Sequence, residues 1–157
     1  MPRITIIIPH FNGWDILNEC LGSVQKNRFS DCEIIVVDNG STDNSVEKIK
    51  SNYPDIKVVE SPVNRGYAGG CNLGVDHAQG EYIVFLNNDT IHEPGWLKIL
   101  SDRLDSDQNI SSVQPKIRNY YNKIKYDYAG GSGGFMDMFC FPFVRGRVFD
   151  TVEVDHE

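Results

Sequence analysis

Four short apolar runs are spaced along the first two thirds of the chain. The first, residues 3–8, is almost entirely β-branched and ends at Pro9, which is typical of a strand buried on both faces of a parallel sheet. Runs at residues 33–38, 56–60 and 82–86 predict three more strands.

Helical spacing fills the segments between these runs. Residues 15–28 place four apolar side chains on one helix face, namely Ile16, Leu17, Leu21 and Val24. Further helices are predicted at residues 44–52, 67–78 and 94–105. Asn44 and Glu47 have the spacing of a capping box, Gly80 is expected to close the third helix, and Pro94 to open the fourth.

Strand and helix therefore alternate four times with short connections, which predicts an α/β fold. We expect an open, mostly parallel twisted sheet with helices on both faces. The pattern weakens after Val113, although residues 114–117 and residues 148–157 each resemble a strand. The sequence thus predicts an α/β domain over residues 1–117 and an irregular tail over residues 118–157.

Charge and hydropathy exclude several classes of function. The 157 residues include 15 Lys and Arg against 22 Asp and Glu, a net charge of -7, with no basic stripe for a nucleic acid. No apolar run approaches the roughly 18 residues that span a bilayer, and no signal peptide is recognisable at the N-terminus. We expect a soluble, cytoplasmic chain without a nucleic-acid partner.

Cysteine and histidine spacing argues against a zinc site bound by protein side chains. The four cysteines form no Cys-x-x-Cys pair and are expected to be reduced structural thiols: Cys20, Cys32, Cys71 and Cys140. Pro94 follows His92 and Glu93, so the helical His-Glu-x-x-His motif is absent.

Polar and glycine residues follow each predicted strand, at residues 9–12, 38–43, 64–70 and 87–90. Ligands of open parallel sheets bind beyond the carboxyl ends of the strands, where loops diverge and helix N-termini point into the gap. The sequence therefore predicts a ligand site built from these four loops.

These loops resemble the ordered signature of family 2 glycosyltransferases, over residues 4 to about 100. The matching motifs are Pro9-x-Phe11-Asn12, Val37-Asp38-Asn39-Gly40-Ser41-Thr42-Asp43, Asn64-Arg65-Gly66 with Ala68-Gly69 and Asn72, and Phe85-Leu86-Asn87-Asn88-Asp89-Thr90. One such motif is weak alone, but four in order are specific. The resemblance implies a GT-A fold, a nucleotide-diphosphate sugar donor, Mg²⁺ or Mn²⁺, and inversion at the anomeric carbon.

The resemblance also assigns donor binding to a set of residues: Pro9, Phe11, Asn12, Asp38, Asn39, Ser41, Asp43, Asn64, Arg65, Gly66, Gly69, Asn72, Asn87 and Asn88. By the family's pattern, Asp38 accepts a hydrogen bond from the N3–H of uracil or thymine; its alternative role is to cap the turn that follows it. Asp43 either contacts the nucleotide or only favours a helix dipole. Phe11 stands where the family often has Tyr, which removes a hydroxyl.

Asp89 is the implied metal ligand. Many members carry a second Asp where this chain has Asn87, but one carboxylate can suffice when the donor phosphates supply further oxygens. The alternative is a polar surface turn. Arg65 either reaches the diphosphate or ribose as a planar cation or forms a surface ion pair.

The family's catalytic base is an acidic residue at the head of a later helix, which deprotonates the acceptor hydroxyl. No segment here matches it, so the sequence predicts a chain truncated before its base, which lies beyond residue 157. The tail, with Tyr128-Ala129-Gly130-Gly131, Gly146-Arg147 and a closing Val-Glu-Val-Asp, is similar to the rhamnosyltransferase-like branch that builds surface polysaccharide. That similarity implies a dTDP-sugar donor and a glycan or lipid-linked acceptor at the inner face of the membrane.

Two other classes of function share features with this sequence. A nucleotide-dependent oxidoreductase shares the α/β alternation but needs a glycine fingerprint after its first strand, where this chain has Pro9-His10-Phe11-Asn12. A non-catalytic nucleotide-binding module would bind nucleotide without turnover, and it remains the alternative to a transferase fragment.

Overall fold

The structure is a computed structural model that describes residues 1–27, 31–123, 134–136, 142–144, 147–148 and 151–152. The chain forms two compact units, Met1–Leu97 and Lys98–Glu157. The predicted boundary after residue 117, between the α/β domain and the irregular tail, stays a prediction.

A four-stranded parallel sheet forms the centre of the first unit, with strand order β3-β2-β1-β4. The strands are β1 (Ile4–His10), β2 (Cys32–Asp38), β3 (Lys57–Glu60) and β4 (Tyr82–Phe85). All four predicted strands are confirmed, with ends within two residues of the expected ones. β1 and β2 run in register from Ile4 opposite Cys32 to His10 opposite Asp38, so their carboxyl ends lie side by side.

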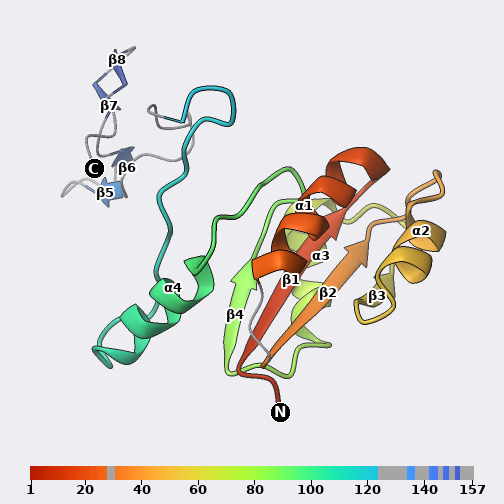
Figure 1. Ribbon diagram of the computed structural model, residues 1–157, viewed down its shortest axis with the longest axis horizontal. Helices are drawn as coiled ribbons and strands as arrows, with labels where there is room; N and C mark the ends of the chain where they lie inside the picture. Colours follow the sequence, from red (N-terminus) through yellow and green to blue (C-terminus); the bar gives the residue numbers. More distant parts are fainter. Residues whose placement is uncertain (28–30, 124–133, 137–141, 145–146, 149–150, 153–157) are drawn as a thin grey trace. The chain divides into compact units, whose positions relative to one another are not determined.

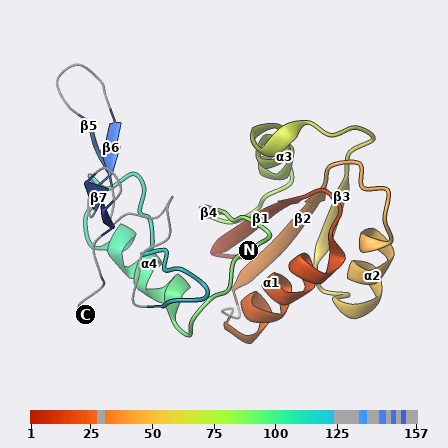
Figure 2. The same ribbon diagram turned by 90° about the horizontal axis from the view of Figure 1, so that it is seen from above.

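Helices cover both faces of this sheet (Figures 1 and 2). In the first unit these are α1 (Trp14–Asn27), α2 (Ser45–Asn52) and α3 (Gly66–Val75), and α4 (Trp96–Asp105) begins at the end of this unit. α1 and α2 pack on one face, and α3 packs on the other. The predicted α/β architecture is therefore confirmed.

The continuous apolar run of β1 follows from this two-sided packing, because all seven of its residues are buried. Ile6 and Ile8 face the core formed with α1 and α2, whereas Ile7 faces the smaller core formed with α3.

Several predicted helix ends need correction. Asn44 is the N-cap of α2, but its side chain makes no capping hydrogen bond, and Asp43 Oδ1 instead accepts from the Ser45 N–H at 3.0 Å. α3 ends at Val75, three residues before the expected end at Ala78, and Gly80 does not close it. Gly80 instead packs against β1, where an added Cβ would lie 2.5 Å from a backbone nitrogen. α4 begins at Trp96, two residues later than expected.

Two predicted strands of the second unit are wrong. Residues 114–117 form no strand, in keeping with Pro115, which has no N–H to contribute to a ladder. Residues 148–157 do not form one strand either, because β7 (Arg147–Val148) pairs antiparallel with β8 (Thr151–Val152). Alternation alone does not separate one strand from two short ones. β5 (Gly134–Met136) pairs in the same way with β6 (Pro142–Val144).

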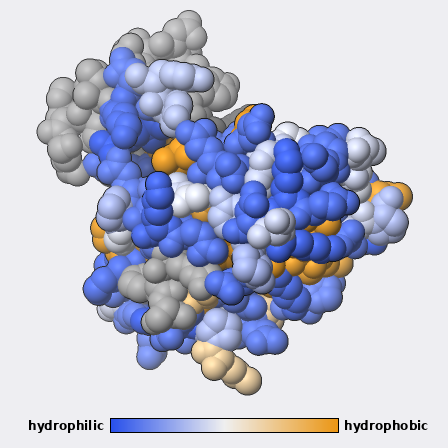
Figure 3. All heavy atoms as spheres, turned by 45° about the vertical axis from the view of Figure 1, so that its right-hand side comes forward, coloured by the Kyte–Doolittle hydropathy of each residue, from blue (hydrophilic) through white to orange (hydrophobic). Residues whose placement is uncertain are grey.

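Other features of the tail lie outside the described residues, among them Cys140 and the motifs at residues 128–131 and 153–155. The described cysteines, Cys20, Cys32 and Cys71, are buried thiols. On the face drawn in Figure 3, hydrophilic side chains predominate and apolar ones form small separate patches. In the part of the chain that the structure describes, no helix combines the length and apolar character needed to cross a bilayer.

Candidate nucleotide-sugar site

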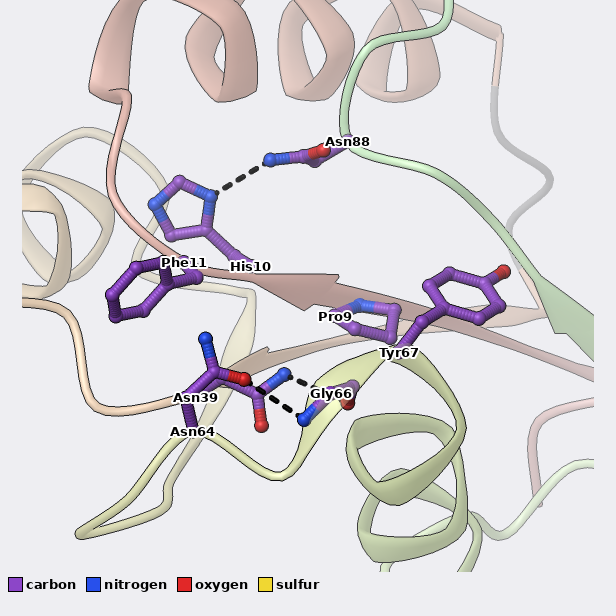
Figure 4. A pocket seen from close by; sticks show the side chains of 8 residues that line it. All are labelled: Pro9, His10, Phe11, Asn39, Asn64, Gly66, Tyr67 and Asn88. Carbon is purple, nitrogen blue, oxygen red and sulfur yellow. Dashed lines mark hydrogen bonds between the residues drawn. The ribbon is translucent and has the colours of Figure 1, made fainter.

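A pocket of about 280 Å³ opens at the carboxyl ends of the strands, as expected for an open parallel sheet (Figure 4). Six of its lining residues were predicted from the sequence: Pro9, Phe11, Asn39, Asn64, Gly66 and Asn88. His10 and Tyr67 also line it and were missed. The structure thus brings together residues of all four predicted loops around one cavity and adds two ring side chains.

His10 is the last residue of β1 and is 1% exposed. Its Nδ1 lies 3.0 Å from the Asn88 amide nitrogen, so Nδ1 accepts and the ring proton sits on Nε2. Figure 4 marks this contact with a dashed line. Burial lowers the pKa of His10, against the carboxylates of Asp38 and Asp43, which raise it. His10 is therefore neutral at pH 7. Its position between Pro9 and Phe11, at a strand end, was the sequence signal that could have found it.

Tyr67 stands in the first turn of α3 and is half exposed, so its ring forms one wall of the pocket. Partial burial, together with Cys71, raises the pKa of Tyr67 to about 12. The start of α3 is fixed by two neighbouring amides. Asn39 donates to the Gly66 carbonyl at 3.3 Å, and Asn64 Oδ1 accepts from the Gly66 N–H at 2.8 Å.

Asp38 is 4% exposed, and its two oxygens have different surroundings. Oδ2 accepts from the N–H groups of Gly40 and Ser41 at 3.2 and 3.1 Å, which is the turn-capping role foreseen as the alternative. Oδ1 is buried and has no hydrogen-bond partner among the described residues. A buried acceptor without a donor is costly, so a ligand N–H would lower this cost.

The loops after β1 and β2 are joined by hydrogen bonds of Asn12, Ser41 and Asp43. None of these three residues lines the pocket. Asn12 Oδ1 accepts from the Thr42 N–H at 2.8 Å, and the Asn12 N–H donates to Ser41 Oγ at 2.9 Å. Asp43 Oδ2 accepts from the Gly13 N–H at 2.8 Å. The positive φ of Asn12, 53°, is a conformation that Asn tolerates better than most residues. These contacts tie the loop after β1 to the loop after β2, and a direct contact of any of the three with the donor stays a prediction.

Arg65, Gly69 and Asn72 also lie outside the pocket lining. Arg65 Nε donates to Ser61 Oγ at 3.0 Å, and within the described ranges the guanidinium makes no ion pair. Gly69 lies one turn after Arg65, where a Cβ would come within 2.6 Å of the arginine Cβ. Asn72 is exposed on the second turn of α3.

The loop after β4 presents one unengaged carboxylate. Asp89 is exposed and accepts no hydrogen bond from the described part of the protein, whereas the carbonyl of its neighbour Asn87 accepts from Thr90 Oγ1 at 2.9 Å. The described residues contain no group of three or more His, Cys, Asp or Glu that could hold a metal by itself. A lone free carboxylate still fits Mg²⁺ or Mn²⁺, which take most of their ligands from substrate phosphates and water in sites of this kind.

Comparison with known proteins supports the sequence resemblance. The model of glycosyl transferase family 2 matches residues 5–143. An uncharacterized glycosyltransferase of Haemophilus influenzae is 36% identical over 134 residues, which cover 83% of this chain and 50% of that protein. A GalNAc(5)-diNAcBac-PP-undecaprenol β-1,3-glucosyltransferase of Campylobacter jejuni is 33% identical over 93 residues, covering 57% of this chain and 30% of that protein. The chain thus spans half or less of these relatives' lengths.

A solved structure shows the same fold. The mannosyltransferase PcManGT from Pyrobaculum calidifontis, in complex with GDP-Man and Mn²⁺, superposes with a TM-score of 0.60 at 26% identity, covering 74% of this chain and 34% of that chain. The family match, the relatives and this fold agree with the loops at the sheet edge. The chain belongs to glycosyl transferase family 2.

Proposed function

We propose that this chain binds a nucleotide-diphosphate sugar and belongs to an inverting glycosyltransferase that acts in cell-surface polysaccharide synthesis. The observation that carries the proposal is the pocket at the sheet edge, which residues of the four family-pattern loops line. Asp38 does not line it, but it directly precedes the lining residue Asn39 and has one buried oxygen that lacks a donor. The proposed acceptor is a glycan or a lipid-linked sugar, by analogy with the undecaprenol-linked substrate named for the Campylobacter relative. We place the protein in the cytoplasm, at the inner face of the membrane where such an acceptor lies.

Recognition of the base is assigned to Asp38. Its Oδ2 is held by two backbone N–H groups, so the carboxylate is oriented, and Oδ1 is left to accept from the imide N3–H of uracil or thymine. The proposed donor is therefore a UDP- or dTDP-sugar. A rhamnosyl-type transferase using a dTDP donor is the specific case that the similarity of the tail favours.

Asp89 is the proposed ligand of Mg²⁺ or Mn²⁺. When bound, the metal neutralises negative charge on the diphosphate leaving group. The Mn²⁺ complex of PcManGT supports this assignment, as does the exposed, unengaged carboxylate of Asp89.

The pocket lining contains no carboxylate, and we propose that the catalytic base is not among the described residues. His10 is buried and already bonded to Asn88, and the raised pKa of Tyr67 makes its phenolate scarce at neutral pH. On this proposal the 157-residue chain binds donor and transfers sugar poorly. The second candidate is a non-catalytic nucleotide-binding module, which the same absence of a carboxylate favours.

Isothermal titration calorimetry tests the donor site. UDP, dTDP and GDP are titrated into the chain with Mn²⁺, and again with EDTA. We expect UDP or dTDP to bind with Mn²⁺ and to lose most of that affinity with EDTA or in Asp89→Ala. Asp38→Asn, which can place an amide N–H against the imide N–H, should weaken binding by roughly 10-fold or more through an unmatched buried donor.

Asp76→Ala is the matched control, because Asp76 is an exposed carboxylate away from the pocket. It should bind like the wild type. The assignment of the donor site is wrong if neither UDP nor dTDP binds to a folded sample. It is also wrong if Asp89→Ala and Asp38→Asn both leave binding unchanged.

A further inference from the structure

The loop from Asn87 to His92 is attached to α1 and β1 on both sides of Asp89. Before Asp89, the Asn87 carbonyl accepts from Cys20 Sγ at 3.7 Å, and the Asn88 amide contacts the His10 ring. After Asp89, the His92 side chain contacts Ser23 of α1. Among the described residues, Asp89 accepts no hydrogen bond in this attachment, and its carboxylate is exposed.

Ser23 of α1 is the centre of the attachment after Asp89. Its hydroxyl donates to the Cys20 carbonyl at 2.8 Å and accepts from the His92 backbone N–H at 3.2 Å. The same oxygen lies 2.9 Å from His92 Nδ1. Because the hydroxyl proton is used on Cys20, Nδ1–H is the donor in this third contact. One small side chain thus engages both the backbone and the ring of His92.

Two more contacts hold His92 in place. Asn27 Nδ2 donates to the Ser23 carbonyl at 2.9 Å and to the His92 carbonyl at 3.0 Å. The His92 ring stacks on Trp96 with centroids 4.5 Å apart. The backbone N–H, the carbonyl and the ring of His92 are therefore all engaged, which is more than a surface turn needs.

A single carboxylate makes the position of its loop important. A metal site with two or three carboxylates tolerates movement of one of them, whereas a site with Asp89 alone depends on where the loop places that side chain. Groups that orient a ligand from outside the metal's own coordination sphere commonly change metal affinity by 10- to 100-fold. Fixing the loop in the empty protein also lowers the ordering cost of binding.

We propose that Ser23, Asn27 and His92 are positioning residues that fix the Asp89 loop against α1 and so set the affinity of the site for the divalent metal. The inference deepens the proposed function and rests on it, because it assumes that Asp89 holds the metal with the nucleotide. Asn87 in place of a second carboxylate is tolerated because the loop is held in position beforehand.

The test compares Ser23→Ala with Ser23→Thr, which keeps the hydroxyl, in the 157-residue chain. Tyr53→Phe is the matched control, since it removes a hydroxyl that bonds Asn18 on the same helix but makes no contact with the loop. Two quantities are measured. Mn²⁺ affinity is determined by electron paramagnetic resonance with saturating UDP or dTDP, and amide hydrogen exchange is followed by mass spectrometry without ligand.

We expect Ser23→Ala to weaken Mn²⁺ binding roughly 10-fold or more while nucleotide affinity in EDTA stays unchanged. Exchange should accelerate in a peptide covering residues 87–92 and stay unchanged in β2. Ser23→Thr and Tyr53→Phe should match the wild type in both measurements. Because a merely structural role of Ser23 would not separate metal affinity from nucleotide affinity, that separation is the decisive readout.

The proposal is overturned if a folded Ser23→Ala binds Mn²⁺ and exchanges amide hydrogen as the wild type does. If Ser23→Ala does not fold, Asn27→Ala decides in its place, since it removes the bond to the His92 carbonyl from the end of the helix. Absence of metal-dependent nucleotide binding in the wild type would refute the proposed function. Exchange in residues 87–92 would then still report whether Ser23 anchors the loop.

Discussion

At the scale of single residues, His92 shows how burial changes the chemistry of a side chain. Its ring packs on Trp96 and meets Ser23, and burial lowers the pKa of His92 from 6.5 to about 4. A histidine with such a pKa is neutral in the folded protein over the whole physiological range. The unfolded chain, in contrast, protonates this residue near pH 6.5.

Folding stability should therefore decrease as the pH is lowered, and part of this decrease should depend on His92. Between pH 7 and pH 5 the unfolded state gains a proton at His92 and the folded state does not, so the free energy of unfolding decreases as the pH falls. We expect this residue to account for about 1 kcal/mol of that decrease, a figure reduced for its partial exposure. The measurement is urea denaturation at both pH values, for the wild type and for His92→Asn.

His92→Asn should lose less stability than the wild type between the two pH values, even if it is less stable at both. The control is His77→Asn, because His77 is exposed on the surface of the unit, and it should retain the wild-type difference. An equal pH dependence for the wild type and His92→Asn would contradict the prediction.

Individual site residues were predictable to different degrees. Pro9 and Asn39 were found because a strand end and a polar loop together mark a ligand site, and both line the pocket. His10 was missed although it stands between Pro9 and Phe11, because that position marks a strand end but does not show whether the ring is buried or solvated. The roles of Asn12 and Asp43 as partners of neighbouring loops depend on backbone N–H groups that a sequence does not display.

At the scale of elements, α3 is packed closely against the sheet by its glycines. At Gly74, an added Cβ would overlap the Ile7 side chain and lie 3.2 Å from a Val37 methyl group. At Gly70, the nearest atoms would be the Asn39 amide at 2.8 Å and the Pro9 ring at 3.0 Å. The small residues of α3 therefore allow a close approach to the sheet, both at Gly70 and in the last turn of the helix.

Gly74→Ala should destabilise the protein by about 1–3 kcal/mol, because the methyl group overpacks a filled interface. Gly22→Ala is its matched opposite: Gly22 lies inside α1, and the nearest atom to an added Cβ is the Tyr53 hydroxyl at 3.8 Å. With space available, the gain in helix propensity should stabilise the protein by about 0.5–1 kcal/mol.

Guanidinium chloride denaturation measures both variants under one set of conditions. A Gly74→Ala variant as stable as the wild type would show that α3 can shift away from β1 at little cost. Loss of stability in both variants would show that the destabilisation is not specific to the interface between α3 and the sheet.

Elements were predicted well where two-sided burial imposed a pattern, as in β1 and β2. Their ends were harder, because capping depends on geometry. Asn44 has the residue type and spacing of a capping box, yet Asp43 makes the bond. The strand prediction for the tail was wrong for a different reason. Residues 148–157 alternate as a strand does, but the period of two does not reveal where a chain reverses its direction.

At the scale of the whole molecule, the titratable groups near the pocket limit what the chain can catalyse. Among the described residues that line the pocket, His10 and Tyr67 have the ionisable side chains. The former is neutral but buried and engaged by Asn88, and the latter has a pKa of about 12. Neither suits the deprotonation of an acceptor hydroxyl, since a general base works best with a pKa near the operating pH and with access to the proton.

We therefore expect the 157-residue chain to bind donor without efficient transfer. General base catalysis typically contributes 10²- to 10⁴-fold to a rate, so transfer should be slower by roughly that factor than in a family member that has its base. The measurement is release of UDP or dTDP from the donor sugar, followed with and without acceptor, at a donor concentration that calorimetry shows to be saturating. A family member of full length serves as the positive control. Release that accelerates with acceptor to the rate of that control would contradict the prediction, and the general base would then have to lie within these 157 residues.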